Sequence, residues 1–217
     1  MPQPAYIFDL DGTLVDSRQD LATAVNLMRR DLGLPPLPLD TVVGFVGHGI
    51  RRLVERALQD AGTPGPSVDD GIGLMRDHYA EHLLDQTALY PGTLAALTAL
   101  AGTGAHLAIV TNKPGEPARR ICDRLGLSAL VPRILGGDAC PRIKPDPMPL
   151  LEVLRQSGAD PTRSWMIGDH VTDLEAGRRA GLRRCLCRFG FGDPGSEVPD
   201  LAVDSLTEFA AHVLRPR

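Results

Sequence analysis

The feature of this sequence that most limits its fold is an alternation of short apolar runs with helical patterns from residue 90 onward. Helical apolar spacing and a terminating glycine follow most of these runs. Because parallel strands need long crossover connections, such alternation predicts a parallel sheet covered by helices on both faces. We therefore expect a doubly wound, Rossmann-like α/β core. Its expected strands after residue 90 span residues 106–110, 133–135, 164–167, 184–187 and 202–203.

One further apolar run, residues 6–8, lies near the start of the chain, and a different kind of sequence follows it. Between residues 17 and 86 the apolar residues keep helical spacing, and no stretch has the character of a strand. We expect residues 1–16 and 87–217 to form the Rossmann-like core, and residues 17–86 to form an inserted, all-helical cap domain. Ser17, with Asp20 three residues later, predicts the N-terminal cap of the first helix.

Composition limits the partners of the chain. Its formal charge is -4 and it has no basic stripe, so we expect no nucleic-acid partner. No apolar run approaches the roughly 20 residues that cross a bilayer, and residues 1–4 leave no room for a signal peptide. The cysteines (Cys122, Cys140, Cys185 and Cys187) lack the spacing of a zinc site and are expected to be reduced thiols. We expect a cytoplasmic protein without a membrane partner, either a monomer or a homodimer.

Two carboxylates follow the first expected strand, in the stretch Phe8-Asp9-Leu10-Asp11-Gly12-Thr13-Leu14. Residues two apart in an extended segment point the same way, so Asp9 and Asp11 are expected to face one site. Like charges so close favour a metal or another cation, because unpaired carboxylates repel each other and are costly to bury. Alone, the pattern is equally typical of a strand that ends in an acidic turn.

Polar residues also follow the later strands. In a doubly wound sheet, ligands bind at the carboxyl ends of the strands, near the point where the strand order reverses. Singly, each of these residues has a simpler explanation, such as a helix cap or a solvated lysine. Together they offer carboxylates, a hydroxyl, backbone N–H groups and a cation, which suit a phosphoryl group bound with Mg2+. The residues at these ends are Thr111, Asn112, Lys144, Asp169 and Asp173.

These motifs resemble those of the haloacid-dehalogenase-like superfamily, specifically its phosphatases with a small helical cap. The resemblance covers essentially the whole chain and implies a two-step hydrolysis. Asp9 would attack phosphorus and form an aspartyl-phosphate, and Asp11 would act as the acid and then the base. A haloacid dehalogenase does not need the second aspartate, so Asp11 favours phosphoryl transfer over carbon–halogen cleavage. The matching stretches are residues 9–17, 110–114, 144–147 and 167–173.

The resemblance also implies a Mg2+ site. The ion would be held by the Asp9 carboxylate, the Asp11 main-chain carbonyl and Asp169, with waters completing an octahedron. Asp173 would order these ligands from behind or contact the ion through water. One departure from the family pattern lies beside this site, because His170 stands where close relatives commonly have serine.

The phosphate would be bound by a separate group of residues. The resemblance assigns its oxygens to the Thr111 hydroxyl and the Asn112 backbone N–H, and it assigns charge neutralisation to Lys144. Ile143 precedes Lys144 where a second lysine is often found. Neither departure from the family pattern removes a group that the reaction needs.

Several stretches, including a loop of the expected cap, resemble phosphoglycolate phosphatases, which makes 2-phosphoglycolate the best single expectation for the substrate. In that loop Gly47 and Gly49 permit close approach of the backbone, with His48 between them. Arg51 or Arg52 is placed to receive a small carboxylate. The alternatives are a solvent-facing loop histidine and a solvated helix face.

The motifs do not determine which leaving group the substrate carries, so other functions are compatible with them. One is a phosphatase for another small phosphate monoester, such as a sugar phosphate. A second is a phosphotransferase resembling β-phosphoglucomutase, which returns the phosphoryl group to a sugar. A third, of a different class, is a phosphate-ligand sensor without turnover, although the intact pair of Asp9 and Asp11 argues against it.

Overall fold

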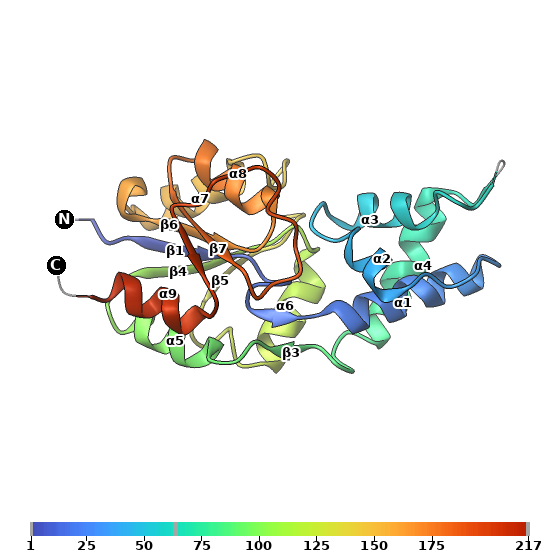
Figure 1. The fold of residues 1–217 in the computed structure, drawn as a ribbon, viewed down its shortest axis with the longest axis horizontal. Coiled ribbons are helices and arrows are strands. Elements are labelled where there is room, and N and C mark those ends of the chain that lie inside the picture. Colours follow the sequence, from blue (N-terminus) through green and yellow to red (C-terminus); the bar gives the residue numbers. More distant parts are fainter. Residues whose placement is uncertain (1, 63–64, 216–217) are drawn as a thin grey trace.

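The structure, a computed structural model, describes residues 2–62 and 65–215. Figure 1 shows two parts, a sheet with helices on both faces and a second group of helices beyond one end of the strands. The strands of the main sheet are β1 (Ala5–Phe8), β4 (His106–Val110), β5 (Arg133–Leu135), β6 (Trp165–Gly168), β7 (Arg183–Cys187) and β8 (Leu201–Val203). They are parallel, in the order β5-β4-β1-β6-β7-β8. The expected doubly wound α/β fold is therefore confirmed, with the strand order reversing at β1.

Alternate residues of β1 pack into separate cores on opposite faces of the sheet. Tyr6 and Phe8 belong to one apolar cluster, whereas Ala5 and Ile7 belong to the other. This alternation follows from the two-residue period of a strand, and burial on both faces explains its uninterrupted apolar sequence. The helices of the first face are α5 (Thr93–Ala101), α6 (Gly115–Arg124) and α9 (Leu206–Val213), and those of the second are α7 (Met148–Ser157) and α8 (Val171–Arg179), as Figure 1 shows.

The second part of the molecule is helical, and its buried apolar residues belong to the same cluster as those of the first face of the sheet. Its described residues form α1 (Arg18–Asp31), α2 (Leu39–Val43), α3 (Ile50–Ala57) and α4 (Val68–Glu81). Met28, Val54 and Met75, from three of these helices, are buried in one cluster. All four helices lie within residues 17–86, where the apolar spacing predicts helices and no strand. We call residues 17–86 the cap, a division of the chain that stays our proposal.

Two short strands join the sheet to the cap. These connectors, β2 (Val15–Asp16) and β3 (Ala88–Leu89), pair with each other in antiparallel fashion. Beside them the Asp20 carboxylate accepts hydrogen bonds from the backbone N–H groups of Gln86 at 3.0 Å and Thr87 at 2.7 Å. The first and last residues of the cap are therefore tied together at its base.

Ser17 is the N-cap residue of α1, as predicted, but the side-chain capping interaction expected of Ser17 and Asp20 is not made. The Ser17 side chain caps no backbone N–H of α1; its hydroxyl instead donates to Asp11 at 2.6 Å. The Asp20 carboxylate is occupied by the connector at the other end of the cap. Both side chains are buried, and both bond to residues outside α1 instead of capping it. The local sequence pattern does not include these partners.

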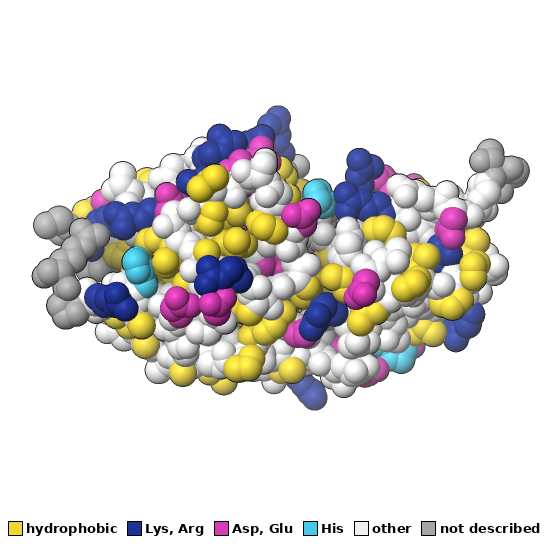
Figure 2. All heavy atoms as spheres, viewed as in Figure 1, with side chains coloured by type: hydrophobic (Ala, Val, Ile, Leu, Met, Phe, Trp, Pro, Cys, Tyr) yellow, Lys and Arg dark blue, Asp and Glu magenta, His cyan; other side chains and the backbone are white. Residues whose placement is uncertain are grey.

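The surface carries charges of both signs. On the face drawn in Figure 2, the Lys and Arg side chains lie in several separate groups, and acidic side chains lie beside most of them. The four cysteines are free thiols, and Cys185 and Cys187 are both buried on β7. Within residues 2–62 and 65–215, no helix is both long enough and apolar enough to cross a membrane.

Candidate active site

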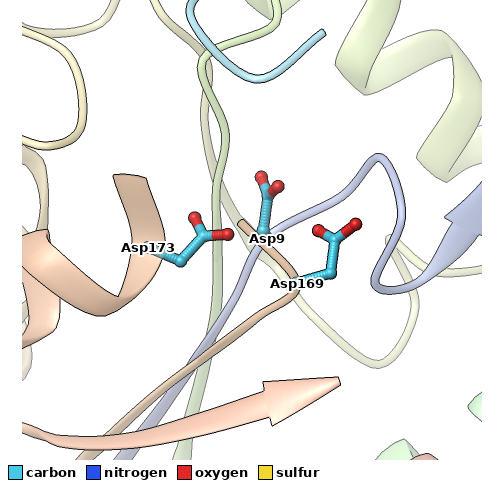
Figure 3. A group of neighbouring side chains, drawn as sticks. All are labelled: Asp9, Asp169 and Asp173. Carbon is cyan, nitrogen blue, oxygen red and sulfur yellow. The ribbon is translucent and has the colours of Figure 1, made fainter. Parts of the chain in front are cut away.

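Three buried carboxylates meet at the carboxyl end of the sheet. Asp9 follows β1 directly, Asp169 follows β6, and Asp173 lies in the first turn of α8. Because β1 and β6 are neighbouring strands, one oxygen atom from each carboxylate lies within 4.8 Å of the others. Figure 3 shows Asp9 between the other two, with the carboxylate of Asp173 directed towards it.

The electrostatics of this cluster fit a bound divalent cation. Burial raises the pKa of Asp9 to about 6, against the opposing effect of Lys144. Burial also raises the pKa of Asp169 well above its usual range, and the charge of Asp173 adds to the effect. Like charges held this close in a buried site favour a cation among them, and Mg2+ prefers oxygen ligands of this kind.

Glycines make room for Asp169. A Cβ atom added to Gly12, whose φ is 82°, would lie 1.9 Å from an oxygen of Asp169. That carboxylate also accepts hydrogen bonds from the backbone N–H groups of Phe191 at 3.0 Å and Gly192 at 2.7 Å. Two chain segments therefore fix its position, and neither supplies a full positive charge.

Lys144 is buried between two of the carboxylates. Its Nζ atom donates to Asp9 at 2.9 Å and to Asp173 at 2.7 Å, and its third partner is the Val110 carbonyl oxygen. Burial alone would lower the pKa of Lys144, but Asp173 and Asp9 outweigh it and raise the pKa. The ammonium group therefore stays charged. Asp173 uses its second oxygen to accept the N–H of His170 at 3.1 Å, so its carboxylate is held behind Lys144.

Asp11 forms an ion pair with Lys113, a residue to which the sequence motifs assigned no role. Lys113 Nζ donates to the two carboxylate oxygens of Asp11 at 2.7 and 2.8 Å, while the Ser17 hydroxyl donates to one of them. Burial would lower the pKa of Lys113, but the Asp11 charge and Tyr79 raise it. Its position could have indicated a site residue, because Lys113 follows Thr111 and Asn112 at the end of a strand.

Thr111 and Asn112 lie at the end of β4, where they were predicted, and both are buried. The Asn112 side chain is fully engaged. Its Nδ2 atom donates to the carbonyl oxygens of Gly47 and Lys144, each at 2.8 Å, and its Oδ1 atom accepts the Lys144 N–H at 2.9 Å. The motif around Asn112 predicts a role for its backbone N–H only, and nothing in the sequence indicates this connection to the cap.

A pocket of about 140 Å³ lies between the strand ends and the cap. It is smaller than the roughly 300–1,000 Å³ of pockets that hold drug-sized ligands, so it suits a small molecule. The predicted core residues that line it are Asp9, Asp11, Thr111, Asn112, Lys144 and Asp169. Asp173 is absent from the described lining and lies behind Lys144. The apolar side of the pocket is formed from the cap by Leu21, Val43, Val46, Ile50, Leu53 and Met75.

The cap loop reaches the pocket through its glycines. Gly47 and Gly49 line the pocket, and the ring of His48 packs edge-on against the ring of His170 with 4.9 Å between their centroids. A Cβ atom on Gly47 would lie 2.8 Å from a ring nitrogen of His170, so only glycine allows this approach. Burial, with His48 nearby, lowers the pKa of His170 to about 4, which leaves the ring neutral at physiological pH.

The structure does not bring the arginine pair of the cap into the pocket. Arg51 donates to Asp69 at 2.7 Å and Arg52 donates to Glu55 at 2.8 Å, on the exposed side of α3. The buried side of this helix is taken by its apolar residues, among them Leu53. The helix therefore directs both guanidinium groups away from the site.

Known proteins resemble this chain in sequence and in fold. The phosphoglycolate phosphatase, plasmid, of Cupriavidus necator is 39% identical to the chain, covering 97% of this chain and 93% of that protein. The phosphoglycolate phosphatase of Chromobacterium violaceum is 40% identical over 94% of this chain and 93% of its own. A crystal structure of a predicted phosphoglycolate phosphatase from Haemophilus somnus superposes with a TM-score of 0.91, at 29% identity and 97% coverage of both chains.

The match to a family covers the sheet from β1 to β7, the cap and every strand end that contributes a buried carboxylate. A family model described as haloacid dehalogenase-like hydrolase matches residues 6–187. The resemblance found in the motifs is thereby confirmed, and the chain belongs to the haloacid dehalogenase-like hydrolase family.

Proposed function

We propose that this protein is a Mg2+-dependent phosphatase that hydrolyses 2-phosphoglycolate to glycolate and phosphate. The observation that carries the proposal is the pairing of two aspartates with two buried lysines around one small pocket. Lys144 holds Asp9 at 2.9 Å and Lys113 holds Asp11 at 2.7 Å. Relatives that cover nearly the whole chain and are named phosphoglycolate phosphatases support the choice of substrate.

In the first step an oxygen of Asp9 forms a bond to phosphorus while the bond from phosphorus to the bridging oxygen breaks. Asp11 gives its proton to that oxygen, so glycolate leaves and an aspartyl-phosphate remains on Asp9. In the second step Asp11 takes a proton from water. The water oxygen then bonds to phosphorus, Asp9 leaves as a carboxylate, and phosphate is released.

The remaining residues position the phosphoryl group and balance its charge. The Thr111 hydroxyl and the Asn112 N–H would donate to its oxygens, and Lys144 would offset the charge shared with Asp9.

The Asp9 carboxylate, the Asp11 carbonyl oxygen and Asp169 would hold Mg2+, with Asp173 positioned behind them by its bond to Lys144. Bound there, Mg2+ supplies positive charge against the phosphoryl oxygens. The apolar side of the cap excludes water from the first step.

A substrate panel tests the proposal. Values of kcat/KM with Mg2+ are measured for 2-phosphoglycolate, other phosphorylated acids, sugar phosphates and nucleotides. We expect 2-phosphoglycolate to give the highest value. A higher kcat/KM for a sugar phosphate would identify that ester as the substrate in place of 2-phosphoglycolate. Isomerisation that depends on glucose bisphosphate would identify a phosphotransferase. Phosphate binding without turnover of any ester would identify a sensor.

A further inference from the structure

The pocket contains a buried hydroxyl group that has no hydrogen-bond partner. Tyr79 of α4 lines the pocket and is 6% exposed, and its hydroxyl makes no hydrogen bond within the described residues, although Lys113 lies close enough to influence its pKa. Burial raises the pKa of Tyr79 to about 12, so the hydroxyl keeps its proton and remains a donor. Because an unpaired buried donor is costly, a group that arrives with the ligand is the natural acceptor.

A cation lies over the ring of Tyr79. Lys113 Nζ is 4.8 Å from the centroid of the Tyr79 ring and contacts Asp11 on its other side. The nearby wall of the pocket is apolar, formed in part by Leu21 and Met75. A cation and an O–H donor beside an apolar wall suit a small anion, which would share Lys113 with Asp11.

We propose that Tyr79 and Lys113 form the subsite for the carboxylate of the substrate. The inference rests on the proposed function. In 2-phosphoglycolate one methylene group separates the carboxyl carbon from the bridging oxygen, and Asp11 must reach that oxygen to protonate it. The carboxylate is therefore confined to the neighbourhood of Asp11, where Lys113 already lies. The Tyr79 hydroxyl donates to the carboxylate, and Lys113 balances its charge.

The other cations of the described structure are poorly placed for this role. Lys144 is held by Asp9 and Asp173 at the phosphate end of the pocket. Arg51 and Arg52 do not line the pocket, and both are exposed. The proposal therefore moves carboxylate recognition from the guanidinium pair expected from the sequence to a residue of the sheet and a residue of the cap.

The test compares 2-phosphoglycolate with ethyl phosphate, which has a methyl group in place of the carboxylate. The measured quantity is the ratio of the two kcat/KM values. We expect Tyr79→Phe, which removes only the hydroxyl, to lower this ratio about tenfold, mainly through KM for 2-phosphoglycolate. The matched control is Tyr90→Phe, because the Tyr90 hydroxyl is also buried without a partner but lies outside the pocket. Its ratio should equal that of the wild type.

A second variant keeps the proposal testable if Tyr79→Phe folds poorly in a thermal melt. Lys113→Met should slow both substrates, because Lys113 contacts Asp11, and should still lower the ratio. If the wild type hydrolyses 2-phosphoglycolate and ethyl phosphate with equal kcat/KM, the protein does not recognise the carboxylate, and 2-phosphoglycolate is refuted as the specific substrate. A high wild-type ratio that both variants preserve would overturn the subsite and leave the proposed function standing. A ratio that falls only in Arg51→Ala or Arg52→Ala would return recognition to the guanidinium pair.

Discussion

The side-chain amide of Asn112 donates a hydrogen bond from the sheet to the cap, reaching the Gly47 carbonyl oxygen at 2.8 Å. The same side chain holds the backbone of Lys144 through two further bonds. One residue thus links the position of the cap loop to the position of a lysine that contacts Asp9. We expect Asn112→Ala to lower kcat/KM about tenfold and to cost about 1–3 kcal/mol in the free energy of unfolding, because buried backbone groups lose their partners.

Asn26 supplies the matched control. Its side chain makes the same kind of double contact, with the backbone of Leu37, but entirely within the cap. Asn26→Ala should lose stability in urea denaturation and keep kcat/KM within about twofold of the wild type. Equal kinetic losses in the two variants would show that Asn112 acts through stability alone.

Asp9→Asn should lower kcat by about 10⁴-fold or more, because an amide is a poor nucleophile towards phosphorus. The fold should survive, since Lys144 keeps its contact with Asp173. Phosphate release measures the first effect and a thermal melt measures the second. A folded variant with kcat near that of the wild type would remove Asp9 as the nucleophile.

Asp11→Asn should slow turnover by about 10²–10⁴-fold, because neither the leaving oxygen nor the attacking water then has a proton-transfer partner. Rapid acid quenching followed by intact-mass measurement should show how much phosphorylated protein accumulates. Asp16→Asn is the control, since Asp16 lies on the same segment but pairs with Arg18 near the surface. A similar rate for both variants would exclude Asp11 as the acid and base.

Removal of metal ions with EDTA should stop turnover, and Mg2+ should restore it. Mg2+ should also raise the Tm of the metal-free protein, because it binds the folded carboxylate cluster and not the unfolded chain. At 100 times its Kd, the ion contributes about 2.7 kcal/mol to stability. Asp169→Asn should abolish the shift in Tm, whereas Asp204→Asn, a surface carboxylate paired with Arg188, should retain it. A Tm that Mg2+ leaves unchanged in the wild type would refute the metal site.

Asp20→Ala should cost about 3 kcal/mol, because three donors of the second connector lose a charged acceptor. The variant Asp31→Ala provides a comparison on the same helix, where the carboxylate pairs with Arg30 and His78 at the surface. Its loss should be about 0–1 kcal/mol in urea denaturation. Similar losses for both would show that the tie between the connectors contributes little.

The sequence was sufficient to predict the residues whose positions follow from strand ends. Asp9, Thr111 and Asp169 come directly after apolar runs, and parallel strands bring such ends together whatever the details of packing. The order of the strands and the helices on both faces follow from the same pattern. These inferences rest on local rules of spacing and on the topology that short connections allow.

Rules of spacing and connection length do not predict the contacts between the sheet and the cap. Lys113 and Tyr79 meet only because α4 lies over the end of β4, and nothing in the spacing of either segment specifies that approach. For Arg51 and Arg52 the sequence left two possibilities open, a carboxylate site and a solvated helix face, and the structure has the second. Which side of α3 is buried depends on its neighbours, and those neighbours turn both arginines outward.

The paired connectors at the base of the cap limit how it can move. Val15 lies opposite Leu89, and Asp20 ties the neighbouring residues together, so the two segments bend as one strap. On the pocket side of this strap, two contacts join the cap to the sheet, one between Tyr79 and Lys113 and one between Gly47 and Asn112. We expect any opening of the cap to turn about the strap and so to separate both contacts in the same motion.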